Sequence, residues 1–174
     1  MEDANKKTVL VVDDEEDVVV YLSTALKSSG FNVITARDGF EAIEKVKEKA
    51  PDLISLDLVM PKRSGAKFYH ELVKNKQWSK IPVLIVTGHA RDDLGKADLK
   101  NLVMSGPGIY LEKPVKPENY IASVKKLLGM ETGKEESEIA DRVELQSNLK
   151  TLIDDADADT LAKIKDMLKK ERFE

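Results

Sequence analysis

Hydrophobic positions in the first two thirds of the chain alternate between two spacings. Short, nearly continuous apolar runs rich in β-branched residues are typical of strands that are buried on both faces of a sheet. We interpret five runs as strands, at residues 8–13, 32–36, 52–57, 81–87 and 109–112. After each strand, apolar residues recur at the three- and four-residue spacing of an amphipathic helix. The clearest helical stretches are residues 18–26, 39–49, 64–74 and 116–128.

Five alternations of strand and helix predict a parallel sheet with helices on both faces. Their combined length of about 120–130 residues fits the doubly wound, flavodoxin-like α/β class, with strand order 2-1-3-4-5. We therefore predict one domain over residues 1–128.

The composition changes after this domain. Residues 129–138 hold two glycines and many charges, which is typical of a linker. Residues 139–174 carry two apolar stripes at helical spacing, and we expect a pair of helices with Asp157 or Asp159 capping the second. The stripes are Leu145, Leu149, Leu152 and Ile153, then Leu161, Ile164, Met167 and Leu168. Core packing is the ordinary role of such stripes, by folding back on the domain, by pairing of the two helices, or in a bundle across a homodimer.

Charge and composition exclude several classes of function. The net charge is −4, and residues 129–174 hold 13 acidic against 8 basic side chains, so we expect no DNA binding. The absence of cysteine excludes disulfides and thiolate chemistry. No apolar run reaches the roughly 18–20 residues that span a bilayer, and the N-terminus is not a secretory signal. We expect a cytoplasmic protein without membrane contact.

Polar residues stand where the predicted strands end. Asp13 and Asp14 close the first strand, and Asp57 closes the third. Thr87 closes the fourth strand and Lys113 follows the fifth. The carboxyl ends of the strands in a doubly wound sheet share one edge, and ligands bind in the crevice there. We therefore expect three carboxylates, a hydroxyl and an ammonium group to converge on one site.

This set of groups predicts phosphoryl chemistry. Closely packed carboxylates repel one another, and an oxygen-rich cluster suits Mg²⁺, which also binds phosphate oxygens. Beside such an ion, one carboxylate can attack a phosphoryl group and form an acyl phosphate. Charge that spreads over the phosphoryl oxygens in the transition state can be neutralised by Lys113, the Thr87 hydroxyl and the metal.

Four segments resemble the hallmark segments of response-regulator receiver domains, the phosphoacceptor (CheY-like) domains of two-component signalling. They are VLVVDDEEDV, DLISLDLVMP, PVLIVTG and YLEKPVKP, and the resemblance covers roughly residues 6–128. It implies that Asp57 is the phosphoacceptor, and that Asp13, Asp14, Asp57 and the backbone carbonyl of Val59 hold the metal. It implies further that Thr87 and Lys113 contact the phosphoryl group.

The resemblance also implies a switch and a partner. Tyr110 matches the family's aromatic switch residue, and Pro61 and Gly65 match the turn after the phosphoacceptor. The expected phosphoryl donor is a phosphohistidine on a histidine kinase or a histidine phosphotransfer protein. Two features depart from the family pattern: the segment between Thr87 and Lys113 is a few residues longer, and its loop-like stretch Ser105-Gly106-Pro107-Gly108 leaves the geometry there open.

Several side chains near the site receive smaller roles. Val59 and His89 follow Asp57 and Thr87 by two residues, and we expect them to set the lifetime of the phosphorylated state. His70 is expected to be a solvated surface residue. Lys62, Arg63 and Lys67 are expected to form an exposed basic edge.

Two other functions are possible for these residues. A phosphatase of the haloacid dehalogenase type uses a second Asp two residues after its nucleophile, where this chain has Val59. An adaptor that acts without phosphorylation would not need all five polar residues of the site. We expect a signalling protein rather than an enzyme, with output through contact with an unknown downstream protein or through homodimerisation by residues 139–174. The alternative is that the same tail caps the switch face and is released on phosphorylation.

Overall fold

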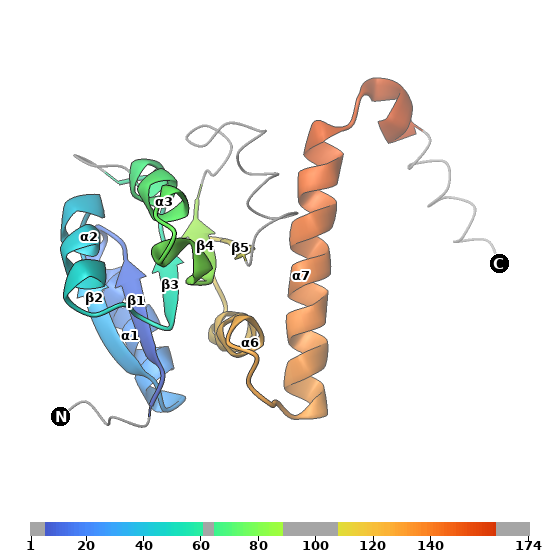
Figure 1. The fold of residues 1–174 in the computed structure, drawn as a ribbon. Coiled ribbons are helices and arrows are strands. Elements are labelled where there is room, and N and C mark those ends of the chain that lie inside the picture. Colours follow the sequence, from blue (N-terminus) through green and yellow to red (C-terminus); the bar gives the residue numbers. More distant parts are fainter. Residues whose placement is uncertain (1–5, 61–64, 89–107, 163–174) are drawn as a thin grey trace.

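The five strands form one parallel sheet in the order β2-β1-β3-β4-β5, as the sequence predicts (Figure 1). In the computed structural model, the described residues are 6–60, 65–88 and 108–162. The strands are β1 Thr8–Val12, β2 Asn32–Ala36, β3 Leu53–Leu56, β4 Val83–Thr87 and β5 Gly108–Glu112. β1, β3 and β4 are buried along their whole length, which explains why their residues are mostly apolar, with Thr8, Ser55 and Thr87 as the buried polar ones.

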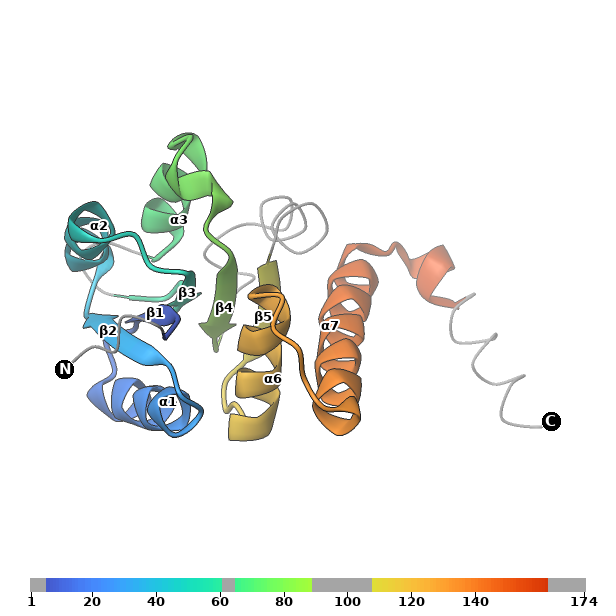
Figure 2. The same cartoon turned by 60° about the horizontal axis from the view of Figure 1, so that its bottom comes forward.

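Helices cover both faces of the sheet (Figure 2). They are α1 Glu16–Ser28, α2 Gly39–Glu48, α3 Gly65–Lys74, α6 Pro117–Leu127 and α7 Lys134–Asp155, with a 3-10 turn at Trp78–Lys80. One core cluster packs α2 and α3 against the sheet, and a second packs α1, α6 and Val143 of α7 against the other face. The expected helix after β4 lies outside the described residues. Within them, no helix has the length and apolar content to cross a membrane.

Local sequence explains where two of the helices begin and end. The Asp38 carboxylate accepts hydrogen bonds from the backbone N–H groups of Phe40 and Glu41, which caps the start of α2. After α1 the chain reverses at Gly30, whose φ of +88° is costly for residues with a side chain. These two turns place the ends of β1 and β2 at the same edge of the sheet.

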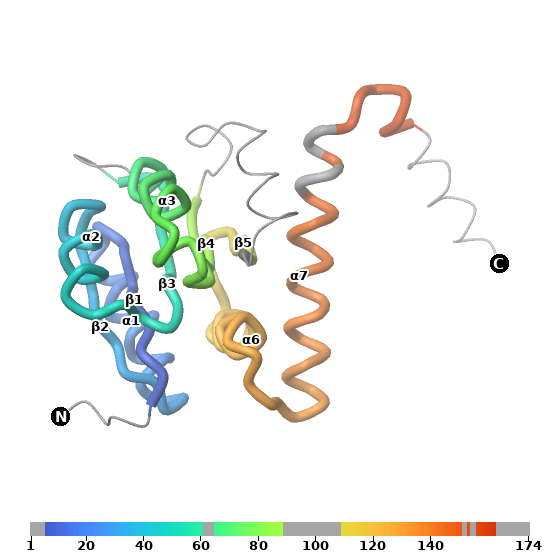
Figure 3. The backbone as a smooth tube through the Cα atoms, viewed as in Figure 1, coloured from blue at the N-terminus to red at the C-terminus, as the bar shows by residue number. Residues whose placement is uncertain are grey.

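The C-terminal extension folds back on the domain. α7 packs along α6 and β5 and is a continuous helix of 22 residues (Figure 3). It begins at Lys134, inside the segment that we predict as a linker over 129–138. Glu135 and Glu136 lie in its first turn, where carboxylates stabilise the helix dipole. The turn after α7 is capped as expected, because the Asp157 carboxylate accepts the Thr160 N–H at 2.8 Å.

The expected apolar stripe of α7 does not form its packed face. Leu145, Leu149 and Ile153 are 59%, 47% and 44% exposed, so they do not fold back on the domain in this structure, and their packing across a homodimer stays a prediction. Among the described residues of α7, Ala140, Val143 and Ser147 are buried instead. Ion pairs with α6 fix the rotation of α7, and the short side chain of Ala140 lets the two helices approach closely. Ile164, Met167 and Leu168, in the second predicted stripe, lie outside the described residues.

Candidate functional site

Three carboxylates lie together at the carboxyl ends of β1 and β3. Asp13 and Asp57 are buried and Asp14 is exposed. Each offers an oxygen, and these oxygens lie within 4.8 Å of one another. The hydrogen bonds between the strands continue to both buried residues. The Asp13 N–H donates to the Ala36 carbonyl at 3.1 Å, and the Asp57 N–H donates to the Val12 carbonyl at 2.9 Å. The sheet itself therefore holds the two carboxylates in place.

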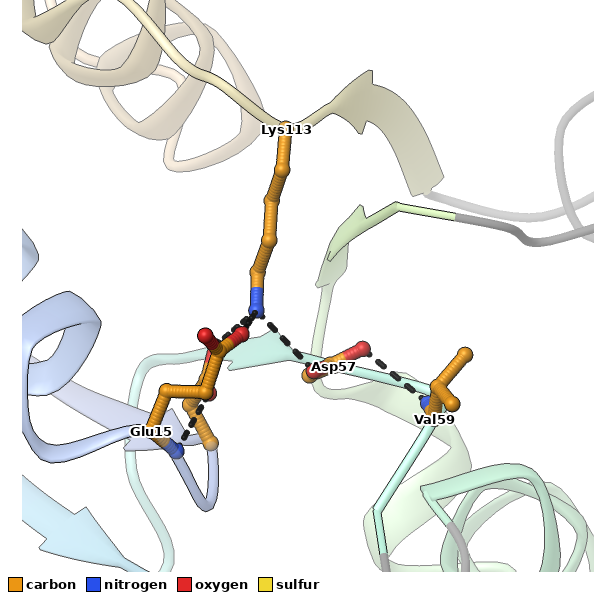
Figure 4. A network of polar contacts seen from close by, with 5 residues as sticks. Glu15, Asp57, Val59 and Lys113 are labelled. Atoms are coloured by element: carbon orange, nitrogen blue, oxygen red, sulfur yellow. Dashed lines mark hydrogen bonds and ion pairs between the residues drawn. The ribbon is translucent and has the colours of Figure 1, made fainter.

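Lys113 reaches into this cluster from the end of β5 (Figure 4). Its Nζ lies 2.8 Å from Oδ2 of Asp13 and 3.0 Å from Oδ2 of Asp57. It also donates to Oε1 of Glu15 at 2.9 Å. The Lys113 backbone N–H donates to the Thr87 carbonyl at 3.1 Å, which ties the lysine to the end of β4. One ammonium group thus faces three carboxylates from two separate parts of the chain.

The charges of the site shift two pKa values. Burial lowers the pKa of Lys113, but hydrogen bonds to Asp13, Glu15 and Asp57 outweigh this effect, and the net pKa is raised. Burial also raises the pKa of Asp13, and the Lys113 ion pair and the Glu15 N–H offset this only in part. The pairing therefore favours the charged form of Lys113, whereas burial disfavours the charged form of Asp13.

The Asp57 carboxylate is oriented at both of its oxygens. Oδ1 accepts the Val59 N–H at 3.0 Å, while Oδ2 is paired with Lys113 (Figure 4). The Asp57 backbone is enclosed as well, since a Cβ added to Gly65 would lie 1.9 Å from the Asp57 carbonyl oxygen. Glycine at the start of α3 is therefore what allows this helix to approach the Asp57 backbone so closely.

Thr87 and Tyr110 occupy the neighbouring strands β4 and β5. Thr87 is fully buried, and its hydroxyl has no hydrogen-bond partner among the described residues. A buried hydroxyl without a partner costs about 1–3 kcal/mol, so this group is available to an incoming acceptor oxygen. Tyr110 pairs with Ile85 in the β4–β5 register and is buried, with Lys150 of α7 over its ring.

The structure therefore brings together Asp13, Asp14, Asp57, Thr87 and Lys113 at one edge of the sheet, as predicted. Val59 lies beside Asp57 with a 44% exposed side chain. His89 and Pro61 lie outside the described residues, as do Lys62 and Arg63. His70 is exposed on α3, as expected, and does not lie at a strand end.

Sequence reasoning missed Glu15 and Lys150. Glu15 extends the acidic run that starts at Asp13, so its place beside the site could have been read from the sequence. Its N–H also donates to Oδ1 of Asp13 at 2.9 Å, which places its side chain toward Lys113. Lys150 lies in a helix far along the chain, and no sequence spacing relates it to β5.

A groove lies beside Lys113, between α1 and the segment after β5. Its apolar lining is Val18, Tyr21, Leu22, Val86, Pro114 and Val115. The Tyr21 hydroxyl donates to the Val115 carbonyl at 3.0 Å and holds the two walls together. The groove thus gives a second molecule an apolar seat next to the carboxylates.

The fold and the site together define a phosphoacceptor domain of the receiver class. The response regulator receiver domain family matches residues 9–125, and the chain belongs to this family. It is 40% identical over 124 residues to the alkaline phosphatase synthesis transcriptional regulatory protein PhoP of Bacillus subtilis, covering 71% of this chain and 49% of PhoP. It is 31% identical over 123 residues to the polar-differentiation response regulator DivK of Brucella ovis, covering 71% of this chain and 97% of DivK.

Solved structures show the same fold. The chemotaxis response regulator CheY4 of Vibrio cholerae superimposes with a TM-score of 0.60 at 28% identity, covering 71% of this chain and 99% of CheY4. The chain spans about half the length of PhoP, so what the rest of that protein does is not carried by the similarity. The homology is consistent with phosphorylation-dependent signalling, and the acidic cluster is of a kind that can hold a metal ion.

Proposed function

We propose that Asp57 accepts a phosphoryl group from a phosphohistidine on a histidine kinase or a histidine phosphotransfer protein. The observation that carries this proposal is the geometry of the Asp57 carboxylate. One oxygen accepts the Val59 N–H and the other faces the Lys113 ammonium, within a cluster of two more carboxylates. A carboxylate held in this way is positioned as a nucleophile, with the groups that neutralise charge already around it.

In this reaction a carboxylate oxygen of Asp57 bonds to phosphorus while the phosphorus–nitrogen bond of the donor breaks. The electron pair of that bond returns to the imidazole, which takes up a proton. Lys113 neutralises one phosphoryl oxygen and the Thr87 hydroxyl donates to another. Because the Thr87 hydroxyl is buried without a described partner, the phosphoryl oxygen would satisfy it.

The donor set fits Mg²⁺. Asp13, Asp14, Asp57 and the Val59 carbonyl supply only oxygen ligands, which Mg²⁺ prefers. These residues would hold the ion, which would supply positive charge beside the phosphoryl group in addition to that of Lys113. The raised pKa of Asp13 supports a cation at this place, since the carboxylate is incompletely compensated by the protein.

The donor helix would seat in the groove beside Lys113. This groove offers apolar contact to a helix that presents its phosphohistidine toward Asp57, and Lys113 lies in its wall. A small chemical donor would not need this contact, and the two kinds of donor therefore separate docking from chemistry.

The role that we propose is signalling rather than catalysis on a separate substrate. The residue two after Asp57 is the apolar Val59, which cannot serve as the general acid of a phosphatase. Chemistry in the chain is then limited to its own phosphorylation and the later hydrolysis of the acyl phosphate, for which Val59 and His89 set the approach of water. Output passes to an unknown downstream protein.

A homodimer through residues 139–174 would use the outer face of α7. Leu145, Leu149 and Ile153 are exposed there and follow one another at four-residue spacing along the helix. Light scattering on the full chain and on a chain ending at Leu128 tests this output. Association of the full chain alone would support it, and one chain per particle for both proteins would exclude it.

The phosphoacceptor is tested by incubating the chain with Mg²⁺ and acetyl phosphate or phosphoramidate, followed by intact-protein mass spectrometry. We expect one phosphate-sized mass gain in the wild type and none in Asp57→Asn. Asp52→Asn is the matched control, because Asp52 lies at the other end of β3 and pairs with Lys7 and Thr8. No gain in a folded wild-type chain would instead make it an adaptor that acts without phosphorylation.

A further inference from the structure

α7 occupies a face of the receiver domain that lies next to the phosphorylation site. It runs beside α6 and the edge strand β5 in both ribbon views (Figures 1 and 2). Its contact buries Ala140 and Val143 and part of Ile139, which is a small apolar surface for a helix of 22 residues. The helix is therefore held by few apolar side chains, and other forces must set its position.

Ion pairs supply much of the remaining contact. Lys125 of α6 lies 2.8 Å from Glu136 of α7. Lys126 of α6 pairs with Asp141 at 2.6 Å and with Glu144. The α6 surface is thus basic and the inner face of α7 is acidic. Partly exposed pairs of this kind are individually weak, so the docked helix can be displaced by a modest change in its seat.

The upper part of α7 is anchored to the strand that carries the site. Lys150 forms an ion pair with Glu112, and its Nζ lies 5.8 Å from the centre of the Tyr110 ring. Glu112 immediately precedes Lys113 and pairs with Thr87 in the β4–β5 register. Two adjacent residues therefore contact the site and the helix: Lys113 pairs with Asp57, and Glu112 pairs with Lys150 of α7.

We propose that α7 is a built-in occupant of the β5–α6 face and that phosphorylation of Asp57 releases it. This inference rests on the proposed phosphoacceptor role. A phosphoryl group on Asp57 would draw in both Lys113 and the Thr87 hydroxyl, which are joined by a backbone hydrogen bond. A shift of these strand ends moves Glu112 and Tyr110 under Lys150, and the anchor of a weakly held helix is lost.

The released face defines its partner by chemistry. It presents Lys125 and Lys126 beside the apolar surface that Val143 covers, so it fits an amphipathic helix with an acidic border, as the inner face of α7 has. α7 and such a partner would compete for one surface. Phosphorylation then raises the affinity for the partner by removing the competitor.

The test is hydrogen–deuterium exchange of the full chain with Mg²⁺, with and without acetyl phosphate, with intact mass measured on the same samples. We expect exchange of the amides of residues 140–150 to rise at least about threefold in wild type on phosphorylation. Asp57→Asn with the donor is expected to show no rise. Lys150→Met is expected to show a rise without donor, since it removes the ammonium but keeps a long side chain.

Lys134→Met is the matched control, because Lys134 is a solvent-exposed lysine at the start of the same helix and pairs with Glu138 of that helix. A chain that gains no phosphate overturns the phosphoacceptor role and the release with it. A chain that gains phosphate while exchange of α7 stays unchanged overturns the release alone. Slower exchange of α7 with a doubled particle mass also overturns it, because α7 would then be covered by a second copy. Equal exchange in Lys150→Met and Lys134→Met would refute the anchor.

Discussion

Gly65 touches the backbone of Asp57: a Cβ at Gly65 would lie 1.9 Å from the Asp57 carbonyl oxygen and 2.9 Å from its carbonyl carbon. Because the obstacle is backbone, Gly65→Ala must displace either α3 or the segment that carries the phosphoacceptor. We expect a loss of about 1–3 kcal/mol in the free energy of unfolding, the range typical of overpacking. We also expect slower phosphorylation by acetyl phosphate.

Urea denaturation and the rate of mass gain measure the two effects. Gly133→Ala is the control, since a Cβ there meets nothing within 4 Å and the residue lies far from the site. Equal unfolding midpoints for the two variants would show that the contact at Gly65 is relieved without cost.

Removal of Lys113 should make the fold depend on a cation. Lys113→Met leaves the buried Asp13 and Asp57 carboxylates without their ammonium partner, and we expect a loss of about 3–5 kcal/mol without metal. Mg²⁺ should then raise the melting temperature of this variant more than that of wild type, because binding to the folded state adds stability. Asp13→Asn combined with Lys113→Met should lose most of this gain. Melting curves with and without Mg²⁺ measure this effect. An equal rise in melting temperature for all three chains would contradict the metal site.

Asp52 gives a pH dependence that does not involve the site. Burial raises its pKa, but the Thr8 N–H and the Lys7 ammonium outweigh this and lower it below the ordinary value of 3.8. A carboxyl group with a lowered folded pKa stabilises the fold above its unfolded pKa, and this stability is lost as the pH falls through the folded value. Asp52→Asn should therefore cost roughly 0.5–1 kcal/mol at pH 7, and the difference from wild type should shrink as the pH falls below 3.8 and through the lowered folded pKa.

Chemical denaturation at a series of pH values follows this difference. Asp38→Asn retains a side-chain oxygen that can cap α2, so it serves as a comparison in which a carboxylate is removed without an ion pair. A constant gap between Asp52→Asn and wild type from pH 7 to pH 3 would rule out the assigned ionisation.

Docking of the donor should depend on α1. Val18 lines the groove beside Lys113, whereas Val20 is 59% exposed and is not part of the groove. Val18→Ser should slow phosphoryl transfer from a phosphohistidine protein by about tenfold, which corresponds to roughly 1.4 kcal/mol of contact. Val20→Ser carries the same change on the same helix and should transfer at the wild-type rate. Both variants should react normally with acetyl phosphate, and a Val18→Ser defect with that donor would indicate damage to the site rather than lost docking.

Periodicity and strand ends predicted much of the architecture and of the site. Apolar runs located the strands to within one or two residues, because strands buried on both faces, such as β1, β3 and β4, consist mostly of apolar residues. Asp57 and Lys113 were predicted together because the topology of a parallel sheet brings its carboxyl ends to one edge. Both inferences use rules that hold for the whole class of fold.

The position of α7 could not be predicted in this way. Leu145 and Leu149 have the spacing of a packed stripe, yet Ala140 and Val143 are buried in their place. The rotation of the helix depends on pairs such as Lys126–Asp141 between elements that the sequence does not relate. Lys150 and Glu112 are 38 residues apart, and only the folded chain shows that they meet.

The residues of the site come from both ends of the domain's sequence, and this determines when a newly made chain can first accept a phosphoryl group in the proposed reaction. Asp13 is synthesised early, but Lys113 follows the last strand of the sheet and reaches Asp13 only after β5 has joined β4. The pairing of parallel strands across such long sequence separations is a late and slow event in folding. Under the proposed reaction, a nascent chain therefore cannot accept a phosphoryl group on Asp57 until its final strand is in place, and this ability arises when the sheet is completed.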